Sequence, residues 1–200
     1  MVRNGEATNA RARILEVACE LFGERGFDAV SVADLAAASG ISTGLIYYHF
    51  TDKQTLYETA VRESVHLLED ASVRALASEG SAAERIRGFV AEYMVLLDSH
   101  ESLMRLLIRT VSDRGGHTPG HVLMRSGAII DRLQAVIEEG ISGGEFRQLD
   151  AHLAAAALFA LINTLVTARA LDTPLGVHGD ADVSRQSAFM SELFLEGVSS

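Results

Sequence analysis

Residues 31–50 of this chain read SVADLAAASGISTGLIYYHF, and this stretch decides the fold. It opens with Ser31 and Asp34 in the spacing of a capping box, in which the serine caps a helix and the acid returns to the serine backbone. Gly40 interrupts the alanine-rich run that follows, and Ser42 is placed to cap a second short helix. Two short helices on either side of a tight, glycine-containing turn predict a helix-turn-helix.

The second of these helices, which runs through Phe50, has two different faces. At about 100° per residue, Ile46 and Phe50 lie one turn apart and are expected to point into a small core. In a helix-turn-helix the second helix enters the major groove of DNA. There, tyrosine hydroxyls can reach phosphate oxygens, leucine can pack on a thymine methyl group, and glycine lets the backbone come close. The remaining surface of the helix carries these residue types at Gly44, Leu45, Tyr47 and Tyr48.

The same letters support a second interpretation. Residues 40–44 match the G-x-S-x-G pattern of serine hydrolases, in which a strand leads into the serine and a helix leaves it. The segment before Ser42 is an alanine-rich, capped helix instead of a strand. A serine hydrolase using Ser42 is therefore a distant alternative, and we expect no enzymatic activity, no metal and no cofactor.

Helical periodicity continues through the rest of the chain. The first helix is expected to end at Gly26, because glycine suits the left-handed position that follows a helix. Hydrophobic residues form 48% of the 200 residues, only 2 prolines are present, and no segment alternates with a period of two. An all-α fold with a sizeable core is therefore expected. Further helices are expected at residues 52–76, 81–97, 101–112, 119–139, 151–170 and 181–197, with the clearest loop at 138–150.

The charge of the chain limits how it can contact nucleic acid. The formal net charge is −10 and the isoelectric point is about 5.1, which argues against binding by bulk attraction. Residues 1–60 hold five arginines and lysines against eight aspartates and glutamates, and Lys53 is the only lysine in the chain. Any contact with DNA must therefore be local and geometric.

Composition also indicates the compartment. Cys19 is the only cysteine, which excludes an internal disulfide and fits a reducing environment. The first residues lack the apolar core of a signal peptide, and no uncharged apolar run reaches the roughly 18 residues that a membrane helix needs. We therefore expect a cytoplasmic protein that does not bind membranes.

The stretch from Ile14 to about Leu56 resembles the DNA-binding signature of the tetracycline-repressor (TetR) family of one-component regulators. The resemblance lies in SVADLAAASGISTGLIYYHFTDKQTL and in the lead-in ILEVACELFGERGFDAV. It implies a three-helix DNA-binding head at residues 8–54. It also implies a larger helical domain at residues 55–200 that binds a small ligand and dimerises.

The resemblance further implies roles for particular residues. Lys53 matches the family's phosphate-binding lysine, Ser31 sits where a backbone phosphate is often held, and Ser42 caps the recognition helix. Many members carry lysine at the position of Thr43 and a small polar residue at that of Leu45, so this head should make fewer phosphate contacts and show a shallow salt dependence. The positions matching the family's DNA contacts are Thr43, Gly44, Tyr47, Tyr48 and His49.

Candidate ligand contacts in the second domain follow from residue type. Apolar residues at helical spacing serve as plain core or line a pocket, and both readings stay open for Phe89, Tyr93, Met94, Met104, Leu107, Ile108, Met124 and Phe159. Polar residues within apolar helices need a partner, which can be a ligand, a helix end or a neighbouring carboxylate. Such residues are Arg109, Arg125, Asn163 and Thr167.

The most apolar helices indicate an interface. Helices at about 151–170 and 181–197 combine small residues with apolar side chains that would otherwise be exposed, which is typical of a homodimer contact. A dimer would read a palindromic operator with two recognition helices. We therefore expect a repressor that binds operator DNA and is released by a small, largely apolar effector. The alternatives are a ligand-independent regulator and an activator.

Overall fold

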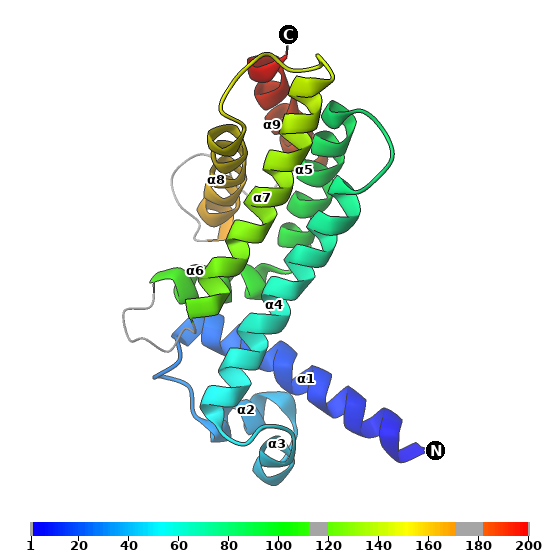
Figure 1. Ribbon diagram of the computed structural model, residues 1–200. Helices are drawn as coiled ribbons and strands as arrows, with labels where there is room; N and C mark the ends of the chain where they lie inside the picture. Colours follow the sequence, from blue (N-terminus) through cyan, green and yellow to red (C-terminus); the bar gives the residue numbers. More distant parts are fainter. Residues whose placement is uncertain (1, 113–119, 171–181, 200) are drawn as a thin grey trace. The chain divides into compact units, whose positions relative to one another are not determined.

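The computed structural model describes residues 2–112, 120–170 and 182–199, and the side chains of these ranges except at 2–8, 111–112, 120–126, 166 and 169–170. Within these ranges the regular elements are α-helices, apart from one isolated antiparallel bridge between Phe146 and Ser199. The all-α fold is confirmed (Figure 1). No helix in the described ranges is long and apolar enough to cross a bilayer.

The helices group into two compact units. The first comprises Met1–Val65 with Ser102–Val122, and the second comprises His66–Glu101 with Leu123–Ser200. The boundary expected at residues 54 and 55 differs from this division in two respects. The first unit keeps the beginning of the fourth helix as far as Val65, and it also contains residues that are distant in sequence from the head.

The first unit is built on α1 (Val2–Arg25), α2 (Val32–Ser39) and α3 (Thr43–His49), which contact one another (Figure 1). It also contains the start of α4 (Lys53–Leu76) and most of α6 (Glu101–Ser112). Apolar side chains from these helices meet in one core, because each helix has an apolar stripe at three- and four-residue spacing. Its buried members include Ile14, Phe22, Leu35, Ile46, Phe50, Leu56, Tyr57 and Leu106.

The end of α1 explains why α6 belongs to this unit. Helix α1 ends before Gly26, which has a φ of +81°, so the predicted helix end is confirmed. A side chain at Gly23 would lie 3.0 Å from the Leu106 nitrogen, so the glycine allows the backbones of α1 and α6 to approach closely. Arg109 on α6 donates to Gly23 O at 2.6 Å and to Glu24 O at 2.5 Å. The guanidinium thus satisfies carbonyls that the end of α1 leaves unpaired.

The second unit is built on α5 (Ala82–Ser99), which contacts both α8 (Ala151–Ala170) and α9 (Val183–Val198). Its interior includes Ile86, Phe89 and Val90 of α5, and Leu158 and Ile162 of α8, all fully buried. The loop expected at residues 138–150 is partly wrong, because α7 (Gly120–Ser142) continues into it.

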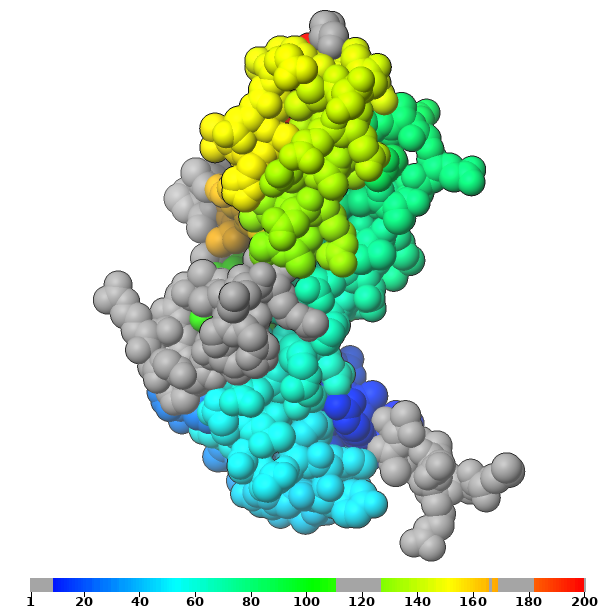
Figure 2. All heavy atoms as spheres, in the orientation of Figure 1, coloured from blue at the N-terminus to red at the C-terminus, as the bar shows by residue number. Residues whose placement is uncertain are grey.

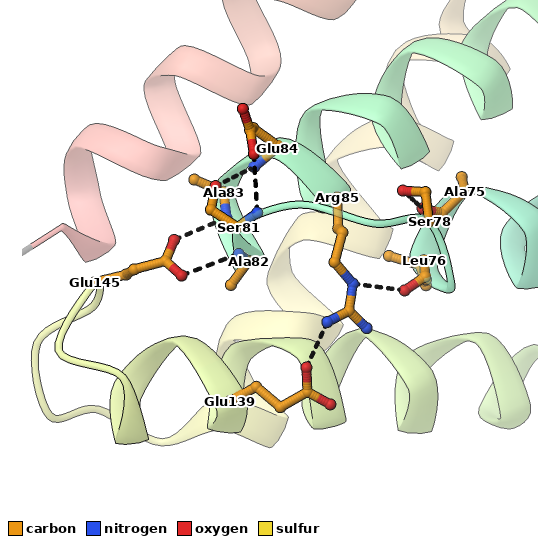
Figure 3. Close-up of polar contacts among 10 residues, drawn as sticks. All are labelled: Ala75, Leu76, Ser78, Ser81, Ala82, Ala83, Glu84, Arg85, Glu139 and Glu145. Carbon is orange, nitrogen blue, oxygen red and sulfur yellow. Dashed lines mark hydrogen bonds and ion pairs between the residues drawn. The ribbon is translucent and has the colours of Figure 1, made fainter.

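The start of α5 lies in a network of polar contacts (Figure 3). Ser81 and Glu84 form the predicted capping box, and the Glu145 carboxylate accepts from the amides of Ala82 and Ala83. Hydrogen bonds from Ser81 lower the pKa of Glu84, so this carboxylate stays ionised at the positive end of the helix. The network ties the start of α5 to the segment that follows α7.

Arg85 joins the same network from α5. Its Nε donates to Leu76 O, the last carbonyl of α4, at 2.7 Å, and its Nη1 pairs with Glu139 of α7 (Figure 3). Arg147 likewise donates to Gly197 O near the end of α9. A cation at the carboxyl end of a helix complements both the unpaired carbonyls and the helix dipole. Several arginines of this acidic chain therefore donate hydrogen bonds to carbonyls at the ends of its own helices.

Candidate nucleic-acid interface

Helix α2 begins as the sequence predicts. The Asp34 amide donates to Ser31 Oγ at 3.1 Å, and the Ser31 amide donates to Asp34 Oδ2 at 2.8 Å. The Ser31 hydroxyl also donates to Asp34, and these bonds lower the pKa of that carboxyl group. Ser31 is exposed, but its hydroxyl is occupied by an ionised carboxylate of its own helix. A phosphate at this position would have to share the serine with Asp34.

The turn between α2 and α3 is held from several sides. Gly40 adopts a φ of +68°, where a side chain would be strained. Ser39 is buried, its hydroxyl donates to Leu35 O at 2.6 Å, and the Ile41 amide donates to Ser39 Oγ at 3.3 Å. Arg13 of α1 donates its Nε to Ser39 O at 2.6 Å. Because these contacts fix the turn, α3 leaves it in a defined direction.

Arg13 and Ser39 were not among the residues predicted to matter. Ser39 offers a weak local signal, since it is a polar residue at the end of an alanine-rich helix. The sequence around Arg13 gives no such signal, because its hydrogen bond to Ser39 joins residues that are 26 positions apart on two helices. Only the packing of α1 against α2 brings the guanidinium to the turn.

Helix α3 presents the two faces expected of it. Ser42 caps the helix by accepting from the Leu45 amide at 3.3 Å, while Ile46 and Phe50 are buried in the core of the first unit. The exposed fraction is 38% at Leu45, 53% at Tyr47 and 78% at Tyr48. Thr43 and Gly44 are exposed as well. Figure 2 shows part of the surface formed by this stretch, coloured between blue and cyan.

His49 lies between the two faces. Its ring is half-buried, with its centroid 5.2 Å from that of Tyr48 and 6.4 Å from that of Phe50. Its Nε2 is buried and has no hydrogen-bond partner in the described part of the chain. The ring therefore packs between Tyr48 on the exposed face of α3 and Phe50 in the core.

Lys53, the first residue of α4, is placed differently from a free surface lysine. Its Nζ donates to Phe27 O at 2.9 Å and to Val30 O at 3.0 Å. The same nitrogen lies 4.1 Å from the centroid of the Phe27 ring. The side chain is thus directed toward the segment between α1 and α2.

Other cations of the head also have partners within the protein. Arg11 pairs with Glu63 at 2.6 Å and lies over the Phe50 ring, 5.6 Å from its centroid. Arg13 is held by Ser39, and Lys53 by two carbonyls. These three cations therefore make contacts inside a head that carries an excess of acidic residues.

The hydrolase interpretation does not fit this geometry. A nucleophile elbow needs a strand before the serine, whereas Ser42 follows helix α2 and the left-handed Gly40. The Ser42 hydroxyl oxygen accepts a backbone hydrogen bond as a helix cap. The G-x-S-x-G match thus arises from a turn glycine, a cap serine and an exposed glycine.

The candidate ligand residues divide between the two units. In the second unit, the Tyr93 ring centroid lies 5.2 Å from that of Phe89 and 6.0 Å from that of Phe159. The Tyr93 hydroxyl bonds Asn163, whose amide donates to Phe159 O at 2.7 Å, and burial raises the pKa of Tyr93. Met94 is buried and Thr167 is half-buried.

The other candidates lie elsewhere. Met104, Leu107 and Ile108 are on the part of α6 that belongs to the first unit, and Met104 is buried. Arg109 donates to carbonyls at the end of α1, and a helix end was one of the three partners expected for it. The side chains of Met124 and Arg125 lie outside the described residues.

Two family models match the chain. The model for bacterial regulatory proteins of the tetR family matches residues 14–60, and that for the tetracyclin repressor-like C-terminal domain matches residues 79–167. The HTH-type transcriptional repressor KstR2 of Mycobacterium tuberculosis is 29% identical over 101 residues, so the match spans about half the length of each protein. AcnR of Corynebacterium glutamicum, also an HTH-type transcriptional repressor, is 35% identical over 42% of this chain and 43% of its own.

Solved structures share the fold along nearly the whole chain. The ketosteroid transcriptional regulator KstR2 of Mycobacterium tuberculosis superposes with a TM-score of 0.75 at 22% identity, covering 95% of both chains. A putative transcriptional regulator from Saccharomonospora viridis, solved in complex with choline, gives a TM-score of 0.76 at 25% identity, covering 96% of this chain and 99% of its own. The helix-turn-helix and the helical second unit together define a transcriptional regulator. This chain belongs to the tetR family of bacterial regulatory proteins.

Proposed function

We propose that the protein is a repressor that binds a palindromic operator as a homodimer and releases it when a small effector binds the second unit. The observation that carries the proposal is the outer surface of α3. A helix with a fixed entry turn exposes Tyr47 and Tyr48, while Ile46 and Phe50 anchor its other side. That is the arrangement in which a recognition helix meets base edges and phosphates.

The residues proposed to contact DNA are those on the exposed side of α3. Thr43 and both tyrosines offer hydroxyl groups, Gly44 allows close approach, and Leu45 offers an apolar contact. The most direct experiment is selection of bound fragments from genomic DNA of the source organism. Enrichment of a palindromic sequence would support the proposal, and the adjacent genes would indicate the effector.

Replacing Tyr48 with alanine should weaken operator binding roughly tenfold or more, since one good contact contributes about 1–3 kcal/mol. Melting temperature should stay nearly unchanged, because 78% of this side chain is exposed. Fluorescence anisotropy with the selected operator measures the first quantity and circular dichroism the second. Tyr48→Phe serves as the control that separates the hydroxyl from the ring. A Tyr48→Ala protein that melts markedly earlier would place Tyr48 in the core and contradict the proposal.

The homodimer contact is proposed for α8 and α9. Helix α9 exposes 63% of Phe189 and 52% of Leu193, which lie one turn apart, and α8 exposes 66% of Leu153 and 40% of Leu161. Large apolar side chains on a surface lose contact with water when a second copy covers them. A two-fold contact through these helices would also pair two recognition helices.

Introducing charge at Phe189 and Leu193 should therefore dissociate the dimer. We expect the double variant Phe189→Glu, Leu193→Glu to behave as a monomer in sedimentation velocity and to lose most operator affinity. Val95→Glu is the matched control, because Val95 is 49% exposed on α5 of the same unit. A double variant with the mass of the wild-type assembly would rule out this interface.

The effector site is proposed around Tyr93 and Asn163. A buried hydroxyl and a half-buried amide beside apolar side chains can form hydrogen bonds without charge, which suits a largely apolar ligand. The similar structures named above include a ketosteroid transcriptional regulator and a putative regulator in complex with choline. A thermal-shift screen of uncharged and cationic compounds tests the proposal. If no compound binds while the operator does, the ligand-independent alternative is favoured.

A further inference from the structure

The last carbonyl of α2 is held by a side chain from another helix. Ser39 is the final residue of α2, and the carbonyls in the last turn of a helix have no amide partner within that helix. Ser39 O accepts a hydrogen bond from Arg13 Nε of α1 at 2.6 Å. A cation at the carboxyl end of a helix complements the helix dipole, and its hydrogen bond is stronger than a neutral one. The last turn of α2 contains no basic residue, so α1 supplies this cation.

The other hydrogen bonds of the turn are local. The buried Ser39 hydroxyl donates to Leu35 O at 2.6 Å and accepts from the Ile41 amide at 3.3 Å. The same amide donates to Ala36 O at 3.2 Å. These three bonds lie between residues 35 and 41, so they shape the turn without joining it to another helix. The bond from Arg13 is different, because it ties the turn to α1.

The core anchors α3 mainly in its carboxyl half. Ile46 is buried, and so is Phe50, which follows the helix. The first three residues of the helix, 43–45, are all exposed, and Ile41 before them is half-buried against the core. In a helix-turn-helix the amino end of the recognition helix meets the base edges. The end of α3 that would read an operator is therefore placed largely by the turn that precedes it.

We propose that Arg13 is a positioning residue: by holding Ser39 O, it sets the placement of the amino end of α3 and thereby the selectivity of the head among DNA sequences. The inference rests on the proposed function, since selectivity presupposes that α3 reads an operator. Arg13 acts here through the turn, so its loss should change the ratio of operator affinity to affinity for unrelated DNA. Affinity for unrelated DNA should change little, because it comes from phosphate contacts, which carry no sequence information.

The test separates the hydrogen-bond donor of Arg13 from its charge. In Arg13→Gln the amide nitrogen occupies the same place along the side chain as the arginine Nε, so a donor is kept while the charge is lost. Arg13→Met removes both the donor and the charge at similar length. Each variant is compared with the wild type by fluorescence anisotropy on the selected operator and on a scrambled duplex. Melting temperature should stay nearly unchanged in both, because Arg13 is exposed.

We expect Arg13→Met to lower the ratio of operator to scrambled affinity roughly tenfold, the effect of losing one charge-assisted hydrogen bond. Arg13→Gln should keep this ratio within about threefold of the wild type, since a neutral donor replaces part of the bond. Amide hydrogen exchange of the free proteins measures the turn directly. The amides of Ile41, Leu45 and Ile46 are bonded within or just after it. Their exchange should accelerate in Arg13→Met and stay near wild type in Arg13→Gln, while residues 82–99 of α5 are unaffected in both.

An Arg13→Gln protein that loses as much as Arg13→Met would overturn the inference, because the charge and not the donor would then be the active feature. Equal losses on the operator and on the scrambled duplex would overturn it in favour of a contact that is blind to sequence. An unchanged affinity ratio in Arg13→Met, or unchanged exchange of the three amides, would overturn it as well. If the wild type selects no operator, the proposed function fails instead, and exchange in the free proteins still decides whether Arg13 holds the turn.

Discussion

The variant Phe22→Ala is expected to lose about 3–5 kcal/mol of unfolding free energy, the range for removing a fully buried phenylalanine. Phe22 has no exposed surface and lies at the centre of the first unit. Its ring contacts Phe27 and meets Tyr57 edge-on, with centroids 6.0 and 5.3 Å away. Truncation removes these contacts and leaves a cavity that rigid helices can fill only in part. Urea unfolding followed by circular dichroism measures the loss.

Tyr47→Ala is the matched control for this experiment. It removes an aromatic ring of similar size from the same unit, but 53% of that side chain is exposed. Its unfolding free energy should change by no more than about 0.5 kcal/mol. Equal destabilisation by the two substitutions would show that the core of the first unit does not lie where the structure places it.

Gly140→Ala is expected to destabilise the second unit by about 1–3 kcal/mol, although alanine favours helices over glycine by about 1 kcal/mol. A side chain at Gly140 would collide with the Phe146 ring and lie 2.9 Å from Ala82 Cβ. The ring cannot easily yield, because Phe146 is 3% exposed and its amide donates to Gly140 O at 3.2 Å. A decrease in melting temperature would record the effect.

Gly88→Ala provides the control. Gly88 also lies inside a helix of the second unit, α5, but an added methyl group there meets nothing within 4 Å among the described residues. The helix preference of alanine should then act alone and stabilise the protein by up to about 1 kcal/mol. Opposite signs for the two variants are the expected result, and equal stabilisation would contradict the packing of Phe146 on α7.

Much of the helix-turn-helix could be predicted because its determinants are local. Ser31 with Asp34, and Ser81 with Glu84, are three residues apart, so their capping boxes can be recognised without a tertiary structure. The division of α3 into a buried and an exposed side follows from the helical repeat alone. Tyr48 could therefore be assigned to the surface before any packing was known.

Contacts between distant segments could not be predicted in the same way. The guanidinium of Arg13 and the ammonium of Lys53 donate to carbonyls that lie 26 and 23 residues away in the sequence. The carbonyl that Arg109 contacts is more distant still. A sequence shows that these residues are cationic, but not which helix end they meet. The family resemblance matches Lys53 to a phosphate-binding lysine, but only the fold shows that its ammonium group also donates to the carbonyls of Phe27 and Val30.

The sequence by itself determined the helices, their caps and the exposed surface of the recognition helix, because these depend on residues a turn or two apart. Only the tertiary structure decided which helices share a unit, why α7 runs past Gly140, and where the cations of an acidic chain are directed. Those features depend on close approach between segments far apart in sequence, as where Gly23 admits α6 and Gly140 admits Phe146. A glycine stabilises such a contact only when another segment fills the space that a side chain would occupy. The local sequence does not show which segment that is.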